Sequence, residues 1–230
     1  MTFEKNVETS ASLRIPDALQ PDPELSLPAL TPETLDSLRE AGWSRVGLMV
    51  AIVDTDGNVL MLNHNGRDKN CQDDLGPLGE TSQQAGPVIE QPLETLFRGI
   101  QEELSVQQPA GLEMWMHERG GWVVNPWPRG DGFPGEYACA ISFPVFVSDK
   151  TRDYLLSIPH GTEEINGIRG FLKPSEILDL DDTSLRPGVK AWLSQLSEAG
   201  LLDLSPDSGL SKIDFSNIYA AGLDDIAFKP

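Results

Sequence analysis

The feature that most constrains the fold is the segment 90–106, which reads EQPLETLFRGIQEELSV. Its apolar residues recur every three or four positions, the spacing that places side chains on one face of an α-helix. They are Leu93, Leu96, Phe97, Ile100 and Leu104. Pro92 suits the first helical position, where its missing N–H would have no intrahelical partner. The pattern predicts a helix from about Pro92 to Leu104 that packs one face against a hydrophobic core.

The polar face of this predicted helix carries several carboxylates. Successive helical residues are rotated by about 100° around the helix axis. Viewed along the axis, Glu102 and Glu103 lie on either side of Gly99, one turn further along the helix, so their carboxylates can converge. Arg98 lies four residues from both Glu94 and Glu102, a spacing at which a guanidinium can hold the two carboxylates. Crowded carboxylates repel one another, so the cluster indicates a divalent cation or neutralising basic groups. Taken alone, the acidic pair would indicate an ordinary solvated helix face.

Upstream of this helix the sequence predicts a shorter helix and a β-hairpin. Residues 31–41 (TPETLDSLREA) begin with a threonine and a proline that suit the N-cap and the first helical position. Residues 45–62 (RVGLMVAIVDTDGNVLML) contain two apolar runs on either side of Asp56-Gly57, a dipeptide typical of a tight turn.

The order of elements along the chain (strand, strand, helix, strands, helix) predicts an α+β sandwich. Residues 63–89 are polar and glycine-containing and are predicted to be a loop, and 107–135 are predicted to be irregular. Further elements are strands at 136–147 and 167–172, a helical turn at 175–178 and a helix at 187–196. Pro144 within the first of these strands indicates a bulge or an edge position, because proline has no N–H for the ladder.

The chain is predicted to divide into three parts. Residues 1–42 form an N-terminal arm with a short helix, 43–197 form the main domain, and 198–230 form a C-terminal tail.

Charge and cysteine content narrow the class of partner. A net charge of −19 disfavours binding to nucleic acid and to anionic membrane surfaces, although bound cations can still admit a small anionic substrate. No apolar run is long enough to span a bilayer. Cys71 and Cys139 show neither a metal-ligand spacing nor a disulfide framework, which fits a reducing compartment. We therefore expect a soluble, cytoplasmic protein.

The segment 90–106 resembles the signature of the Nudix hydrolase family, G-x5-E-x7-R-E-U-x-E-E-x-G-U, in which U is an aliphatic residue. The residues that match it are Glu90, Arg98, Ile100, Glu102, Glu103 and Val106. The resemblance extends to residues 45–62, which look like the family's first strands, and to Pro77-Leu78-Gly79, which looks like its Pro-Gly-Gly. Residues 165–178 and 185–188 also look like segments of the family. The resemblance implies a Nudix-like α/β/α sandwich with a mixed sheet.

Three positions depart from the signature. Gly99 stands where the family has a glutamate that binds metal and is often a candidate base. Gln84 stands where the first glycine is expected, and the glycines at 79 and 86 indicate a loop lengthened by about five residues. Ser105 replaces the last glycine. Of the three departures, the one at Gly99 affects the expected chemistry, because glycine has no side-chain oxygen that could bind a metal.

The resemblance implies a metal-dependent hydrolase that cleaves the diphosphate of a nucleoside diphosphate linked to another moiety. Mg²⁺ or Mn²⁺ would be held by Glu102 and Glu103, and Arg98 would orient these carboxylates. With Gly99 in place of the usual candidate, Glu164 or its neighbour Glu163 is the best candidate for the base. The alternative is a catalytically degenerate Nudix-fold module that binds or senses a nucleotide. Members of the family often form dimers, so a homodimer is an expectation.

Several other polar and aromatic residues have a structural and a functional interpretation. Glu90 is expected to pair with Arg98 or to cap the loop before the helix, and Glu136 is a weaker candidate for the base. The histidines are expected to be surface or loop residues; they are His64, His117 and His160. Three of the five tryptophans lie in the segment 107–135 and are expected in the core more than on a nucleotide base: Trp115, Trp122 and Trp127. Three basic loop residues could meet phosphate: Arg67, Lys69 and Arg129.

Overall fold

A computed structural model describes residues 13–64, 75–85, 88–128, 136–158, 165–204, 209–216, 218 and 224–225. Its helices are η2 (Asp17–Leu19), α1 (Pro32–Glu40), α2 (Pro92–Glu102), η3 (Pro109–Gly111), α3 (Asp149–Ser157), α4 (Pro174–Asp179), η4 (Asp182–Ser184) and α5 (Val189–Glu198). Its strands are β1 (Arg45–Val53), β2 (Val59–His64), β3 (Leu75–Gly76), β4 (Leu78–Thr81), β5 (Gln83–Ala85), β6 (Val88–Ile89), β7 (Met114–His117), β8 (Val123–Pro128), β9 (Tyr137–Val147), β10 (Ile165–Leu172), β11 (Leu210–Lys212) and β12 (Asp224–Asp225).

The main sheet is mixed and has the strand order β10-β2-β1-β9-β7-β11. Its central pair, β1 and β9, is parallel along the whole of β1, and the other described pairs are antiparallel. Strand β4 also pairs with β1, and β8 pairs with β9. A smaller sheet joins β12, β5 and β6.

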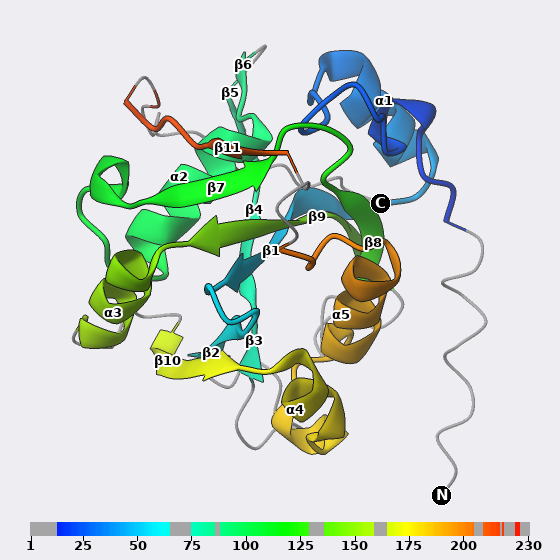
Figure 1. Cartoon of the computed structure of the whole chain (residues 1–230). Helices are drawn as coiled ribbons and strands as arrows, with labels where there is room; N and C mark the ends of the chain where they lie inside the picture. Colours follow the sequence, from blue (N-terminus) through cyan, green and yellow to red (C-terminus); the bar gives the residue numbers. More distant parts are fainter. Residues whose placement is uncertain are drawn as a thin grey trace, which may run out of the picture.

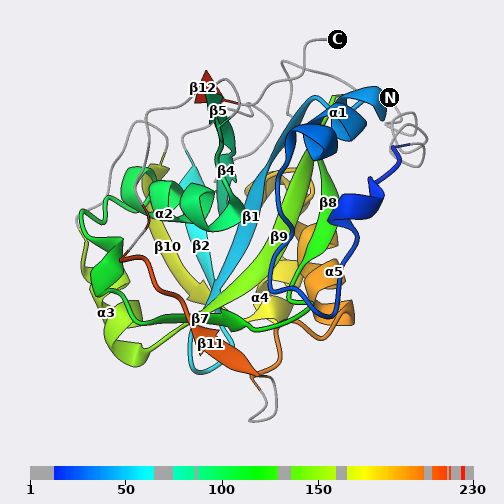
Figure 2. The ribbon, with the colours of Figure 1, turned by 90° about the horizontal axis from the view of Figure 1, so that it is seen from above.

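Helices cover both faces of the main sheet, with α2 and α5 on opposite sides of β1 and β9 (Figures 1 and 2). Alternate residues of β1 contribute to two separate cores, as the two-residue period of a strand requires. Leu48 and Val50 belong to the core that contains α2, whereas Met49 and Ala51 belong to the core that contains α5. The predicted α/β/α sandwich with a mixed sheet is therefore confirmed.

The predicted hairpin at 45–62 is confirmed at its turn. Asp54 Oδ1 accepts hydrogen bonds from the backbone N–H groups of Asp56 and Asn58 at 3.0 and 2.8 Å, and Gly57 adopts a φ of 78°. The register pairs Val53 with Val59. Beyond that point the two strands separate, and each takes longer-range partners.

The predicted helices are confirmed within two or three residues at each end. Thr31 is the N-cap of α1, and its Oγ1 accepts from the N–H of Thr34 at 3.2 Å. Pro92 occupies the first turn of α2. None of the described helices is long and apolar enough to cross a membrane.

Two predictions of irregular structure are wrong. Residues 63–89 contain β3, β4, β5 and β6, and 107–135 contain η3, β7 and β8. These strands are short, and glycine and proline interrupt them, so they show little alternation in sequence. Strand β4 pairs with β1, from which β2 and β3 separate it in the chain, so no local pattern indicates this partner.

Pro144 lies in a central strand and not at an edge. It pairs with Ala51 of β1 on one side. On the other side, the described pairing of β9 with β8 ends at Ser142 and that with β7 begins at Phe146. Pro144 thus falls in a gap between two partners, where its missing N–H breaks no described ladder bond.

Segments outside the predicted main domain also contribute to the structure. Leu19 and Leu30 are buried in the core that contains α2. Leu210 of β11 pairs with His117 of β7 and extends the sheet.

Candidate functional site

The site is built where α2 packs on β4. Strand β4 runs antiparallel to β1, with Glu80 opposite Leu48. At the start of α2, Glu94 Oε2 accepts a hydrogen bond from the N–H of Gln91 at 2.7 Å. Glu94 is thus used to cap the helix, and the predicted contact between Glu94 and Arg98 is wrong. A carboxylate in the first turn is stabilised by the free N–H groups there, which explains this choice of partner.

Arg98 lies at the centre of a cluster of carboxylates, which we call the Arg98 cluster: Glu80, Glu90 and Glu102 with Arg98 itself. Nε of Arg98 contacts Glu90 Oε1 at 3.0 Å, and Nη2 contacts Glu90 Oε2 at 3.1 Å. Nη1 contacts both Glu80 Oε1 at 3.1 Å and Glu102 Oε2 at 3.0 Å. The predicted contacts of Arg98 with Glu90 and Glu102 are present, and Glu80 is a partner that the sequence analysis missed.

The Arg98 cluster runs from the interior to the surface. The side chains of Arg98 and Glu90 are 5% and 4% exposed, that of Glu80 is 15% exposed, and that of Glu102 is 58% exposed. Glu90 is also anchored by the N–H of Gln83 at 2.9 Å and by the hydroxyl of Thr95 at 3.0 Å. Its two oxygens are thereby occupied, so Glu90 has the structural role that was expected.

Burial sets the protonation of this cluster. Burial would lower the pKa of the Arg98 guanidinium, but the hydrogen bond to Glu90 and the three negative charges outweigh it and raise the pKa. Arg98 is therefore always charged. Burial raises the pKa of Glu80 from 4.5 to about 7, against the opposing effect of Arg98, and the neighbouring charge of Glu102 adds to the increase.

Glu102 and Glu103 occupy different environments. Glu103 is a buried residue at the C-cap of α2, where its N–H donates to the carbonyl of Gly99 at 2.8 Å. Glu102 is exposed and turns toward Arg98. Across the described part of the chain, no three His, Cys, Asp or Glu side chains are gathered closely enough to hold a metal ion. The carboxylates thus surround a guanidinium in this arrangement.

Gly99 lies directly against Glu80. A Cβ added to Gly99 would stand 3.3 Å from Glu80 Cβ and 3.6 Å from Glu80 Cγ, with Leu78 Cδ1 at 3.8 Å. A Cβ at position 99 would therefore be in tight contact with the stem of Glu80, which would have to shift slightly to admit it. No spacing rule connects these two positions in the sequence, because they meet through the packing of α2 on β4.

Other candidates lie outside the described residues or are structural. The former are Glu163, Glu164, His160, Cys71, Arg67, Lys69 and Arg129. Glu136 is described and lies half-buried before β9. Trp122 and Trp127 are buried, in agreement with a core role, and burial raises the pKa of the Cys139 thiol to about 12, which makes it unreactive.

The expectation that the histidines are surface residues is wrong for the two that are described. His64 is buried, and its ring contacts the carbonyl of Pro77 at 3.1 Å and Arg186 at 3.3 Å. His117 is buried against the carbonyl of Leu201 at 2.9 Å. Both rings connect segments distant in sequence, a role that no local pattern shows.

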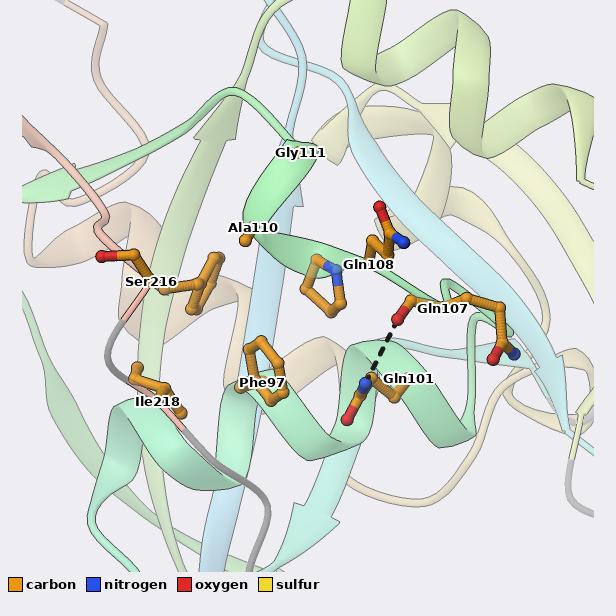
Figure 3. A pocket seen from close by; sticks show the side chains of 10 residues that line it. Phe97, Gln101, Gln107, Gln108, Ala110, Gly111, Ser216 and Ile218 are labelled. Atoms are coloured by element: carbon orange, nitrogen blue, oxygen red, sulfur yellow. Dashed lines mark hydrogen bonds between the residues drawn. The ribbon is translucent and has the colours of Figure 1, made fainter.

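A pocket of about 520 Å³ lies beside the other flank of α2 (Figure 3). Phe97 and Gln101 of α2 line it together with η3 and the segment near Phe215. The rings of Phe97 and Phe215 are 5.6 Å apart. No member of the Arg98 cluster lines this pocket.

Comparison with known proteins gives a distant structural likeness. The crystal structure of a MutT protein from Methanosarcina mazei Go1 is similar over 68% of this chain and 94% of that chain, with 12% sequence identity and a TM-score of 0.44. No protein-family model matches the sequence. No curated protein matches it either. We therefore base the function on the contacts of this chain's own residues.

Proposed function

We propose that this protein is a divalent-cation-dependent hydrolase that cleaves the diphosphate of a small nucleoside diphosphate derivative. The observation that carries the proposal is that, among the described residues, three carboxylates share the single guanidinium of Arg98. The resemblance of 90–106 to the Nudix signature supports the same reaction.

The residues fit Mg²⁺ or Mn²⁺ in their chemistry. Both ions prefer oxygen ligands, and Glu102 and Glu103 would supply carboxylate oxygens at the end of α2. Glu102 must exchange its contact with Arg98 for the cation. Its side chain is 58% exposed, so it can turn without leaving an unpaired charge in the interior.

When bound, the cation would neutralise charge on the diphosphate oxygens and activate a water molecule. Residues of the chain would hold α2 and β4 in position around the cation. Arg98 joins α2 to β4 through Glu80 and through the carbonyl of Thr81, and so fixes the spacing between the two elements. Glu90 holds the guanidinium from the buried side. Glu164, or its neighbour Glu163, remains the proposed base.

The net charge of −19 supports a small substrate whose negative charge is met by the cation, and it disfavours nucleic acid as a partner. The pair of cysteines without disulfide spacing supports a cytoplasmic location.

A second candidate function is nucleotide binding without hydrolysis. Gly99 favours it, because the carboxylate that the family places there is absent from α2. Both functions predict that nucleoside diphosphate derivatives bind, but only the first predicts products.

A panel of nucleoside diphosphate derivatives, incubated with Mg²⁺ or Mn²⁺ and assayed for released phosphate compounds, tests the proposal. We expect turnover that needs the cation and falls by at least about a hundredfold in Glu102→Gln/Glu103→Gln, as loss of a group that stabilises transition-state charge requires. Binding without products for every compound would replace hydrolysis by the second function.

A further inference from the structure

The pocket beside α2 is enclosed by three segments that are distant in sequence. Figure 3 shows Phe97 and Gln101 of α2 on one side of the pocket and Ala110 and Gly111 of η3 on the other. The segment that follows β11 closes a third side and contributes Phe215 to the lining. Tertiary packing therefore forms this pocket, and no sequence motif indicates it.

The wall that follows β11 is held in place by the sheet and the core. The N–H of Ile213 donates to the carbonyl of Met114 on β7 at 2.9 Å, and Ile213 and Phe215 are only 6% and 3% exposed. The ring of Phe215 packs against that of Phe97, with centroids 5.6 Å apart and planes inclined at 55°. Ordered walls favour ligand binding, because they lose little conformational freedom when a ligand enters.

The lining of the pocket suits an uncharged aromatic ring system. Among the described residues, none of those that line it carries a charge, although the whole chain has a net charge of −19. Phe97 offers an aromatic ring, on which a planar ring can stack. The volume of about 520 Å³ also lies within the range of small-molecule sites, about 300–1,000 Å³.

Three side-chain amides supply the polar groups of the pocket: those of Gln101, Gln107 and Gln108. Each amide carries both hydrogen-bond donors and an acceptor, and the edge of a purine base presents the complementary groups. Nε2 of Gln101 reaches the backbone carbonyl of Gln107 at 3.4 Å (Figure 3). This distance is long for a hydrogen bond, so a ligand can replace the contact.

We propose that this pocket binds an uncharged purine base, which stacks beside Phe97 and forms hydrogen bonds with Gln101. The site is separate from the Arg98 cluster, because no member of that cluster lines the pocket. The proposal does not depend on the proposed function, since neither a cation nor a phosphate takes part in the binding.

Titration with adenosine, an uncharged purine nucleoside, tests the proposal by saturation-transfer NMR. A chelator in the buffer excludes any contribution from a bound cation. We expect wild type to bind adenosine and not to bind ribose, which lacks the base. Phe97→Leu should bind adenosine about tenfold more weakly, because it keeps an apolar side chain but loses the ring face. Gln101→Met should bind about fivefold more weakly, because it keeps the length of the side chain but loses the amide.

A variant that fills the pocket gives a second test with a matched control. Ala110→Leu adds bulk from an exposed position in η3 and not from the core, and should weaken adenosine binding about tenfold through steric overlap. Ala191→Leu makes the same change at an exposed position of α5, on the other side of the sheet, and should bind as wild type does. Thermal melting establishes that both variants are folded.

Three outcomes would overturn the proposal. The first is a wild-type protein that does not bind adenosine. The second is binding that Ala110→Leu leaves unchanged, and if Glu102→Gln removes this binding, the nucleoside lies at the Arg98 cluster instead. The third is a dimer, detected by sedimentation velocity, that Ala110→Leu dissociates, because a second copy of the chain would then occupy the pocket. Each of these leaves the cation-dependent hydrolysis to its own assay.

Discussion

Two arginines of this protein each hold three carboxylates, and they differ in burial. Arg98 contacts Glu80, Glu90 and Glu102, whose side chains are 15%, 4% and 58% exposed. Arg152 contacts Asp149 and Asp153 at 3.1 and 3.0 Å and Asp56 at 3.9 Å, and the side chains of these partners are 64%, 68% and 75% exposed. The acidic partners of Arg152 are therefore exposed to water, whereas two of the three acidic partners of Arg98 are largely buried.

Exposure to solvent determines how strongly the charges in each cluster interact. Around Arg152, water screens the charges and the ion pairs contribute little to stability. Around Arg98, removal of water raises the pKa of Glu80 to about 7 and makes each partner depend on the others. The two clusters thus differ in how strongly each ion pair depends on its neighbours.

The largest expected effect comes from removing the buried arginine. Arg98→Ala removes the guanidinium that pairs with the buried Glu90, and should lower the free energy of unfolding by about 3–5 kcal/mol. Urea unfolding followed by circular dichroism measures it. Equal unfolding midpoints for Arg98→Ala and wild type would show that the Arg98 cluster does not hold α2 on β4.

A smaller effect is expected within the Arg98 cluster itself. Glu90→Gln keeps the shape but loses the charge at a side chain that is 4% exposed, and should cost about 1–3 kcal/mol of unfolding free energy. Glu102→Gln, at a side chain that is 58% exposed, should cost about 0–1 kcal/mol. Unfolding of the two variants in the same buffer compares them. A larger loss of unfolding free energy in Glu102→Gln than in Glu90→Gln would contradict the explanation that burial determines the size of the effect.

Stability should also depend on pH through Glu80. Its folded pKa of about 7 lies above the value of 4.5 for the free group, so the folded state keeps a proton that the unfolded state releases. This contribution is fully present below about pH 4.5 and is lost as the pH rises through about 7.

Melting temperatures of wild type and Glu80→Gln, taken from pH 5 to 8 in the presence of a chelator, test this prediction. Wild type should lose stability relative to Glu80→Gln as the pH rises across that window. Parallel curves for the two proteins would mean that Glu80 titrates as it does in water.

The smallest effect is expected at the exposed cluster. Arg152→Ala should leave the urea midpoint close to that of wild type, because all three partners remain solvated after the change. The measurement is made beside Arg98→Ala as its matched control. If Arg152→Ala lowered the urea midpoint as much as Arg98→Ala does, burial of the carboxylates would not determine how much each arginine contributes to stability.

Local patterns in the sequence determined the elements that depend on neighbours along the chain. The stripe from Leu93 to Leu104 predicted α2, Thr31-Pro32 predicted the start of α1, and Asp56-Gly57 predicted the turn after β1. The contacts of Arg98 with Glu102 and Glu90 were also predictable, the first from helical spacing and the second from the resemblance to a known signature. For the two helices, the turn and the Arg98–Glu102 contact, the physical cause acts over a few residues.

Tertiary structure alone decided the features that join distant segments. Glu80 meets Gly99 and Arg98 because β4 pairs with β1 and α2 packs across both strands. The pairing of β4 depends on partners that no local period reveals, and its sequence therefore predicted a loop. Burial is likewise a property of the whole fold. It raises the pKa of Glu80 and separates the Arg98 cluster from the Arg152 cluster, although both consist of one arginine and three acids.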